Sequence, residues 1–468
     1  MKLKRGLLSL LAFLSLSVYG FAQDGQDTDS HNEELNEKDF VALREYLKTK
    51  REIPLEEKDE HLSISGDVRF EWRHMNESQS GNSLRGGKKA NPFTGIAISR
   101  NDFDCEFNLK FDYILDKTWA VAHLQYDNSA GVDSQDIICQ DDREGFFGSG
   151  RCDDLCLKKA YFGYSFWDNP CSRFDVEIGR RGNLYYVFDS RVQFLSRLDG
   201  IVFKYEASSD LMRKYYAKLA GFVVDERVNH FAWATEVGAI DIMESGFDLK
   251  YSFIDWMPHA RGRCGKIICK DKNIPPVFRN KAKYIHDPLA FQFYVSQWTA
   301  AYNFDPEWFC SVPVKAYGAF LMNHGRKYAK VYKGTNIVAT PFNEDLYKKK
   351  GKPTTNIKAN LGWYVGVLIG EVEKEGDWSV EAQYQYVEAL CMPEMDEAGI
   401  SRGNVLGESF TQTGRGFTNY KGWKVEALYA ITNELSLDAI IEASKEANRR
   451  LGGRHRYSKV ELEAIYAF

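Results

Sequence analysis

The chain has 468 residues and a formal net charge of −5, a balance that says little about its partners. Aromatic residues make up 14% of the chain and charged residues 27%, and the mean hydropathy is −0.43. Beyond the first 22 residues, no stretch approaches the roughly 18 consecutive apolar residues that a transmembrane helix requires. The sequence therefore excludes a helical membrane protein.

The N-terminal residues have the organisation of a secretory signal peptide. Residues 1–5 are basic, an apolar run spans residues 7–21, and Gly20 and Ala22 place small side chains at the −3 and −1 positions of a cleavage site. We therefore expect residues 1–22 to be a signal peptide that directs the chain to the cell envelope.

Residues 23–60 form a hydrophilic leader. Phe40, Leu43 and Leu47 recur at helical spacing after a candidate N-cap at Asn36. This pattern predicts one short amphipathic helix on the periplasmic side. Its role is left open between a plug, an oligomerising arm and a solvated linker.

From residue 61 the apolar residues alternate with a period of two, which is typical of strands. Val68, Phe70 and Trp72 share one face, and charged residues separate them. We expect residues 61–468 to form an all-β antiparallel barrel of about 16 strands, within the range 14–18. The candidate strands are 62–74, 100–114, 118–128, 154–166, 172–180, 199–207, 211–222, 231–242, 246–256, 288–303, 308–322, 358–371, 377–391, 419–431, 434–447 and 456–468.

The lengths of the connections favour a membrane barrel over a soluble sandwich. Taken in order, the even-numbered connections are short, and the odd-numbered ones are mostly long (75–99, 129–153, 181–198, 257–287, 323–357 and 392–418). Short periplasmic turns that alternate with long outward loops are the topology of an outer-membrane barrel. The high aromatic content fits the aromatic girdles of such a barrel.

The C-terminal strand supports the same conclusion. Val460, Leu462, Ala464 and Tyr466 lie on one face, and the chain ends at Phe468. This ending resembles the terminal strand of outer-membrane barrels, where a final Phe is read by the barrel assembly machinery. The resemblance implies that machinery as a partner through Phe468.

A barrel of about 16 strands is wide enough to leave an aqueous channel, so the sequence predicts passive diffusion of small hydrophilic solutes or ions. We expect it in the outer membrane of a Gram-negative-type bacterium, in contact with lipid and lipopolysaccharide. No enzymatic motif is found, and we expect no cofactor and no nucleic-acid partner. Whether the barrel forms a homo-oligomer is left open.

If the apolar face meets lipid, the charged alternates line the lumen. The predicted lumen-facing residues are Arg69, Glu71, Arg73, Glu106, Lys110, Asp112, Lys159 and Glu177. The third outward connection is rich in aromatics and arginines, which suggests that it folds into the barrel. We expect a pore constriction there that favours anions. It would be formed by Arg180, Arg181, Asp189, Arg191 and Arg197.

The nine cysteines are an odd and high number for such a barrel. In an oxidising envelope, Cys139 could pair with Cys152, and Cys264 with Cys269. With an odd count, at least one thiol stays free or pairs with another chain. No CxxC pair occurs and the histidines do not cluster near the cysteines, so no metal site is expected.

The stretch from residues 62–69 through 178–181 and 188–191 to 199–200 resembles outer-membrane proteins of chlamydia-like bacteria. This resemblance, which covers the leader and the first six strands, implies a porin-like barrel in an envelope rich in disulfide crosslinks. The same segments bear a more distant likeness to alginate-export-type and phosphate-selective porins. The alternative function is a surface-exposed structural or adhesin-type barrel, crosslinked by disulfides in the envelope.

Overall fold

In the computed structural model, the chain divides into two units, Met1–Glu45 and Tyr46–Phe468. All described residues belong to the second unit. The described residues are 53–54, 61–79, 81–86, 100–129, 154–181, 187–193, 198–209, 211–225, 230–257, 293–304, 312–325, 327–331, 355–393, 396–401, 418–451 and 454–468. The predicted signal peptide and the predicted periplasmic helix lie outside them. Within these ranges, no helix has the length and apolarity to cross a membrane.

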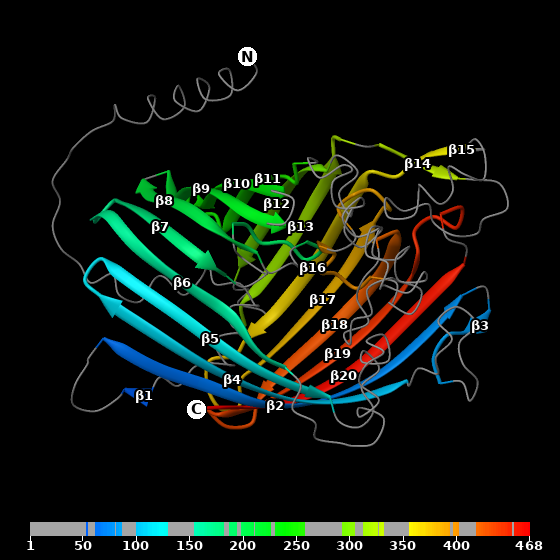
Figure 1. The fold of residues 1–468 in the computed structure, drawn as a ribbon, viewed down its shortest axis with the longest axis horizontal. Coiled ribbons are helices and arrows are strands. Elements are labelled where there is room, and N and C mark those ends of the chain that lie inside the picture. The colour runs from blue at the N-terminus through cyan, green and yellow to red at the C-terminus, as the bar shows by residue number, and fades with distance from the viewer. Residues whose placement is uncertain are drawn as a thin grey trace, which may run out of the picture. The chain divides into compact units, whose positions relative to one another are not determined.

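Sixteen strands form one closed antiparallel barrel, as the sequence predicts (Figure 1). They are β2 (Leu62–Gln79), β4 (Asn101–Leu115), β5 (Thr118–Ser129), β6 (Asp154–Asn169), β7 (Ser172–Arg180), β8 (Asp199–Ser209), β9 (Met212–Asp225), β10 (His230–Ile242), β11 (Phe247–Asp255), β12 (Tyr294–Phe304), β13 (Val314–Asn323), β16 (Leu361–Glu371), β17 (Trp378–Val387), β18 (Tyr420–Ala430), β19 (Leu435–Glu446) and β20 (His455–Ala467). Each strand pairs with the next, and β20 pairs with β2 from Asp67↔Ala467 to Gln79↔His455. That last pairing closes the sheet, so the barrel has no free edge.

Four shorter strands lie outside this ring. β1 (Ile53–Pro54) and β3 (Asn82–Ser83) each add two residues to β2. β14 (Tyr328–Val331) and β15 (Thr355–Lys358) pair with each other beyond the ends of β13 and β16.

The apolar side chains point out of the barrel and the charged ones point in. Phe70 and Leu462 are 64% and 49% exposed, whereas their charged neighbours Arg73 and Glu461 are buried. A soluble sandwich has the opposite arrangement, because its apolar faces pack against each other. On these strands the outer face of the barrel is therefore apolar and the inner face is polar.

Short turns gather at one rim of the barrel. Backbone hydrogen bonds link neighbouring turns there, including Ser165 N to Lys117 O at 2.8 Å and Met243 N to Leu211 O at 2.9 Å. The C-terminal end of β20 lies at the same rim, because Ala467 N donates to Glu434 O at 2.8 Å. The long connections start and end at the opposite rim, where Trp256 N donates to Phe293 O at 3.1 Å.

The C-terminal residue seals the seam between β20 and β2. Phe468 N donates to Gly66 O at 2.9 Å, and Gly66 N donates to Phe468 O at 3.0 Å. The Phe468 ring stacks against Phe107 with centroids 6.3 Å apart. A Cβ at Gly66 would lie 2.6 Å from the backbone oxygen of Asn108 and 2.7 Å from the Phe468 ring.

We therefore expect Gly66→Ala to lower the free energy of unfolding by about 1 to 3 kcal/mol, because the added methyl group must displace backbone at the seam. Urea unfolding in detergent, read from heat-modifiable migration, measures the change. Gly221→Ala on β9 is the matched control, since a Cβ there meets nothing within 4 Å. Equal unfolding midpoints for the two variants would show that the seam tolerates the methyl group.

Candidate functional site

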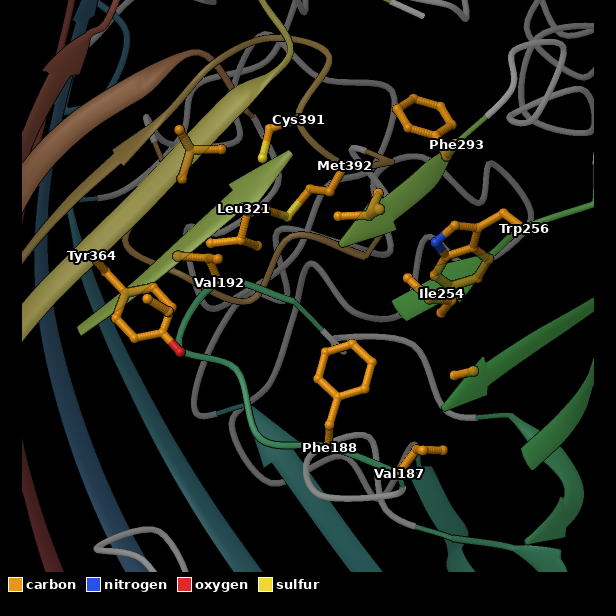
Figure 2. Packing of buried hydrophobic residues seen from close by; sticks show 14 of the residues in the cluster. Val187, Phe188, Val192, Ile254, Trp256, Phe293, Leu321, Tyr364, Cys391 and Met392 are labelled. Atoms are coloured by element: carbon orange, nitrogen blue, oxygen red, sulfur yellow. The ribbon is translucent and has the colours of Figure 1, made fainter. Parts of the chain in front are cut away.

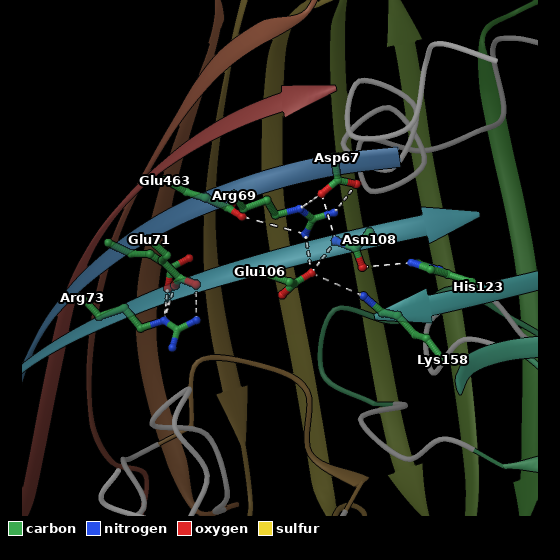
Figure 3. Close-up of polar contacts among 10 residues, drawn as sticks. Asp67, Arg69, Glu71, Arg73, Glu106, Asn108, His123, Lys158 and Glu463 are labelled. Atoms are coloured by element: carbon green, nitrogen blue, oxygen red, sulfur yellow. Dashed lines mark hydrogen bonds and ion pairs between the residues drawn. The ribbon is translucent and has the colours of Figure 1, made fainter. Parts of the chain in front are cut away.

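Charged side chains of β2, β4 and β20 form an ion-pair network on the inner wall (Figure 3). Arg69 pairs with Asp67 and also reaches Glu106 at 3.3 Å. Arg73 pairs with Glu71 and reaches Asp104 at 2.5 Å. The alternation of β2 places these side chains on the face opposite the exposed Phe70. The predicted lumen-facing residues of β2 and β4 thus lie on the inner face and contact one another.

The remaining predicted lumen-facing residues occupy the same face. Lys110 Nζ lies 2.5 Å from Asp112 Oδ2 on β4. Lys159 stands opposite His123 in the β5–β6 register, and the His123 ring nitrogen Nε2 is 2.9 Å from Asn108 Oδ1. Figure 3 shows that this imidazole and the β4 side chains point toward one another.

Glu177 on β7 joins residues of three other parts of the chain. Its carboxylate lies 2.8 Å from Lys204 Nζ and 3.2 Å from Arg181 Nη1, and it accepts a hydrogen bond of 3.2 Å from Trp119 Nε1. The Arg181 guanidinium also lies over the Tyr161 ring, 4.1 Å from its centroid. One buried carboxylate therefore pairs with two positive side chains, Arg181 and Lys204.

Residues 187–193 follow β7 and precede β8 in the sequence, and they run through the interior of the barrel. We call them the inward segment. Val187, Phe188 and Val192 are fully buried in a cluster with apolar wall residues (Figure 2). The wall residues come mainly from β8 to β13, and the cluster includes Val202, Ala220, Phe222, Ala232, Ala234, Ile254, Val295 and Leu321. The aromatic and apolar residues of this connection are thus buried against an apolar part of the inner wall.

Two glutamines hold the backbone of the inward segment. Gln297 on β12 accepts a hydrogen bond from Ser190 Oγ at 2.8 Å, and its Nε2 donates to the carbonyl of Asp189 at 2.7 Å. Gln385 on β17 donates from Nε2 to the carbonyl of Arg191 at 3.2 Å. These strands are not neighbours of β7 or β8 in the sheet. The inward segment therefore crosses the lumen to reach them.

Arg191 forms the charged anchor of the inward segment. Its Nη2 lies 3.0 Å from Glu381 Oε1 on β17, and its guanidinium lies 5.2 Å from the centroid of the Tyr317 ring. The Tyr317 hydroxyl donates a hydrogen bond to the same carboxylate. The positive charge of Arg191 is thus neutralised inside the barrel rather than presented to solvent.

A second segment, residues 388–393 and 396–401, follows β17 and contacts the inward segment. The sequence predicts a strand over residues 377–391, but β17 ends at Val387, so the C-terminal part of this prediction is wrong. The chain turns there because Leu390 N donates to Ala359 O at 2.7 Å, and Cys391 and Met392 enter the apolar cluster. Figure 2 shows the sulfur atom of Met392 beside Leu321.

Farther along, the second segment contacts both the inward segment and the wall. Ala398 N donates to the Val192 carbonyl at 3.0 Å, and Ile400 N donates to Gln385 Oε1 at 2.9 Å. The Tyr420 hydroxyl on β18 donates to Glu397 at 2.8 Å. Sequence reasoning missed this segment, although its run of apolar residues from 389 to 392 breaks the alternation expected of a strand.

The structure places the predicted constriction residues at different positions. Arg180 pairs with Asp199 at 2.6 Å at the rim, where its side chain is 42% exposed and lies on the outward face with Ile178. Arg181 and Arg191 point inward to Glu177 and Glu381, respectively. Asp189 lies in the inward segment, and Arg197 lies outside the described residues. The described arginines thus do not share one carboxylate partner.

The structure describes four cysteines, Cys105, Cys156, Cys171 and Cys391, and joins none of them to another in a disulfide. Burial raises the pKa of the Cys391 thiol, so this group stays protonated and weakly nucleophilic. The disulfide candidates Cys139, Cys152, Cys264 and Cys269 lie outside the described residues. In the described part of the chain, no group of three or more His, Cys, Asp and Glu side chains is placed to hold a metal ion.

No protein-family model matches the chain, and no curated protein sequence matches it. Among solved structures, it is similar to a high-pH structure of Pseudomonas putida OprB, with 9% identity, coverage of 87% of this chain and 94% of that chain, and a TM-score of 0.45. It is also similar to a double mutant of Rh. blastica porin, with 9% identity, coverage of 87% of this chain and 100% of that chain, and a TM-score of 0.42. Neither likeness identifies a solute.

Proposed function

We propose that this protein is a porin-type channel of the outer membrane that lets small hydrophilic solutes or ions diffuse passively. The observation that carries the proposal is the closed barrel of sixteen strands with an apolar outer face and a charged inner face. A sheet can cross a membrane only when its edges are paired, and its outer face must be apolar to meet lipid. A barrel of this strand number is wide enough for an aqueous lumen.

The inward segment is the proposed constriction of this channel. It crosses the lumen between the wall at β7 and the anchors Gln297 and Gln385. A segment held at several points narrows the path without closing it by itself, as selectivity elements of channels do. Asp189 and Arg191 belong to this constriction, and Arg181 lies at its base, directly after the end of β7. Arg180 pairs with Asp199 at the rim and lies outside the narrowest part of the proposed channel.

The membrane partners follow from the same proposal. Lipid and lipopolysaccharide would contact the outer aromatic residues such as Phe162 and Trp298, which are exposed. The assembly machinery would read the strand that ends at Phe468. The alternative is a structural or adhesin-type barrel of the envelope, through which no solute passes.

Liposome swelling tests the proposal. Vesicles that contain the refolded full-length protein should swell in isosmotic solutions of small neutral sugars and amino acids, at rates that fall as solute size increases. Vesicles with heat-denatured protein are the control. If the protein migrates as a folded, heat-modifiable barrel and the vesicles do not swell with any solute, the channel function is contradicted and the structural alternative is favoured.

A further inference from the structure

Three positive side chains stand next to one another on the outer face of the barrel, close to the rim that carries the long connections. They are Lys421 on β18, Lys445 on β19 and Arg456 on β20, and we call them the basic row. The register pairs Lys421 with Lys445 and Lys445 with Arg456 on neighbouring strands (Figure 1). Directly opposite side chains lie about 5 Å apart, so the basic row spans about 10 Å.

The alternation of each strand places the basic row on the outward face. Each of its members lies an even number of residues from an exposed apolar side chain of the same strand, namely Trp423, Ile441 and Leu462. Lys445 and Arg456 are exposed, and the third member is half-buried. From the middle of these strands toward the rim, the outward side chains therefore change from apolar to positively charged.

Aromatic side chains lie beside the basic row on the next two strands. The Trp363 ring of β16 stacks against Tyr384 and Tyr386 of β17, with centroids 5.6 and 5.9 Å apart. In the register, Tyr386 stands opposite Lys421. Membrane barrels place aromatic girdles where the hydrocarbon core meets the lipid headgroups. In the proposed channel, the basic row therefore lies at the depth of the headgroups.

The described residues do not neutralise the basic row. No described carboxylate oxygen lies within 4.0 Å of its charged nitrogens. The connection between β19 and β20 adds more positive charge, since Arg450 and Arg454 are exposed there. Like charges directly opposite each other across strands destabilise a sheet, so an anion that binds the basic row from outside the chain stabilises this one.

Two carboxylates near the basic row are held by other groups. Glu446 follows Lys445 on the inward face of β19, and it accepts hydrogen bonds from Arg449 Nε at 2.7 Å and from His455 N at 2.9 Å. Both oxygens of Glu388, just beyond the end of β17, accept hydrogen bonds of 2.8 and 3.3 Å. The basic row therefore presents its charge to whatever surrounds the barrel.

We propose that the basic row binds the phosphate groups of a glycolipid in the outer leaflet, while the acyl chains of that lipid cover the apolar outer face below the row. This inference rests on the proposed channel function, because only a barrel placed in the outer membrane turns its outer face to lipid. The ammonium groups of the two lysines and the guanidinium of Arg456 form charge-assisted hydrogen bonds with phosphate oxygens. A phosphate group carries a charge of about −1.5 to −2 at pH 7, so a lipid with two phosphates offsets all three cations.

Titration of the refolded full-length protein in non-ionic detergent with diphosphorylated lipid A tests the proposal. A ligand that binds the folded state raises the thermal midpoint, which heat-modifiable migration measures. The wild type should gain stability with this lipid, and the gain should shrink as KCl is added, because salt screens exposed charges. Dephosphorylated lipid A and inorganic phosphate are the comparison probes, and neither should raise the midpoint at the same concentration.

A cation near a membrane surface contributes about fivefold to the affinity for an anionic lipid. The double variant Lys445→Gln with Arg456→Gln should therefore need about thirtyfold more diphosphorylated lipid A for the same stabilisation. The matched control is Lys117→Gln with Lys374→Gln, which removes two exposed lysines from turns at the opposite rim and should titrate like the wild type. The exchange Lys445→Arg with Arg456→Lys keeps both charges and should also titrate like the wild type.

Without lipid A, the Lys445 and Arg456 double variant should be at least as stable as the wild type, because it removes two like charges that stand opposite each other. A much lower midpoint without lipid would assign these side chains to the stability of the fold and overturn the proposal. Equal titrations of the wild type and the double variant, or equal stabilisation by inorganic phosphate, would also overturn it. A failed titration with intact vesicle swelling contradicts this inference alone, whereas failed swelling with an intact titration contradicts the channel function alone.

Discussion

Replacing Gln297 and Gln385 together by alanine should raise the single-channel conductance, because these two side chains hold the inward segment across the lumen. The three shortest hydrogen bonds with the inward segment that the double variant loses run from Ser190 Oγ at 2.8 Å, to Asp189 O at 2.7 Å and to Arg191 O at 3.2 Å; a longer one, from Gln193 Nε2, is 3.4 Å. At about 1 kcal/mol for each bond, the released state of the segment gains about 3 kcal/mol, or about a hundredfold in population. Planar-bilayer recordings should show larger steps and frequent transitions between two levels.

Gln125→Ala is the matched control for this variant. Gln125 is a buried inner-wall glutamine of β5, and its register partners Asn108 and Cys156 belong to the wall rather than to the inward segment. Its conductance should equal that of the wild type. An unchanged step size in the Gln297 and Gln385 double variant would mean that the inward segment does not limit the current.

Replacing Arg191 by methionine should destabilise the barrel strongly. The substitution leaves the Glu381 carboxylate buried on β17 without the guanidinium that lies 3.0 Å from it. Breaking one side of a buried ion pair costs about 3 to 5 kcal/mol, because the remaining charge is uncompensated. Urea unfolding in detergent, followed by heat-modifiable migration, should show a midpoint well below that of the wild type.

The double variant Arg191→Met with Glu381→Gln should recover most of this loss. Glutamine keeps an acceptor for the Tyr317 hydroxyl, which donates to Glu381 in the wild type, and removes the stranded charge. A thermodynamic cycle over the two single variants and the double variant isolates the interaction between the pair. Additive losses would show that Arg191 and Glu381 do not depend on each other.

The strand positions could be predicted from the sequence because the barrel obeys one simple period. In β2, Val68, Phe70 and Trp72 alternate with charges, and a slip by one residue would expose the charges to the apolar outside. The alternation of short and long connections also predicted that the turns lie at one rim of the barrel and the long loops at the other. The alternation depends on residues next to each other in the chain, so no knowledge of distant contacts was needed.

The anchors of the inward segment could not be predicted in the same way. An inward glutamine in a strand has the same sequence pattern whether it faces water or holds another segment. Gln297 binds Ser190 across a separation of 107 residues, and Gln385 binds Arg191 across 194. The aromatic content of the third outward connection indicated that it packs against something, but the sequence does not show which wall residues it meets.

The ion-pair partners of the arginines in the third outward connection could not be predicted from the sequence either. Four arginines between residues 180 and 197 suggest an anion site when they are counted along the chain. The three of them that the structure describes, Arg180, Arg181 and Arg191, pair with Asp199, Glu177 and Glu381, and the last of these carboxylates is supplied by a strand far along the sequence.

The most direct test of the channel function is single-channel recording of the refolded full-length protein in a planar bilayer. We expect stable, stepwise increases in conductance from protein that shows heat-modifiable barrel folding, and none from the same protein after heat denaturation. Folded barrels that insert into the bilayer and give no steps would contradict it.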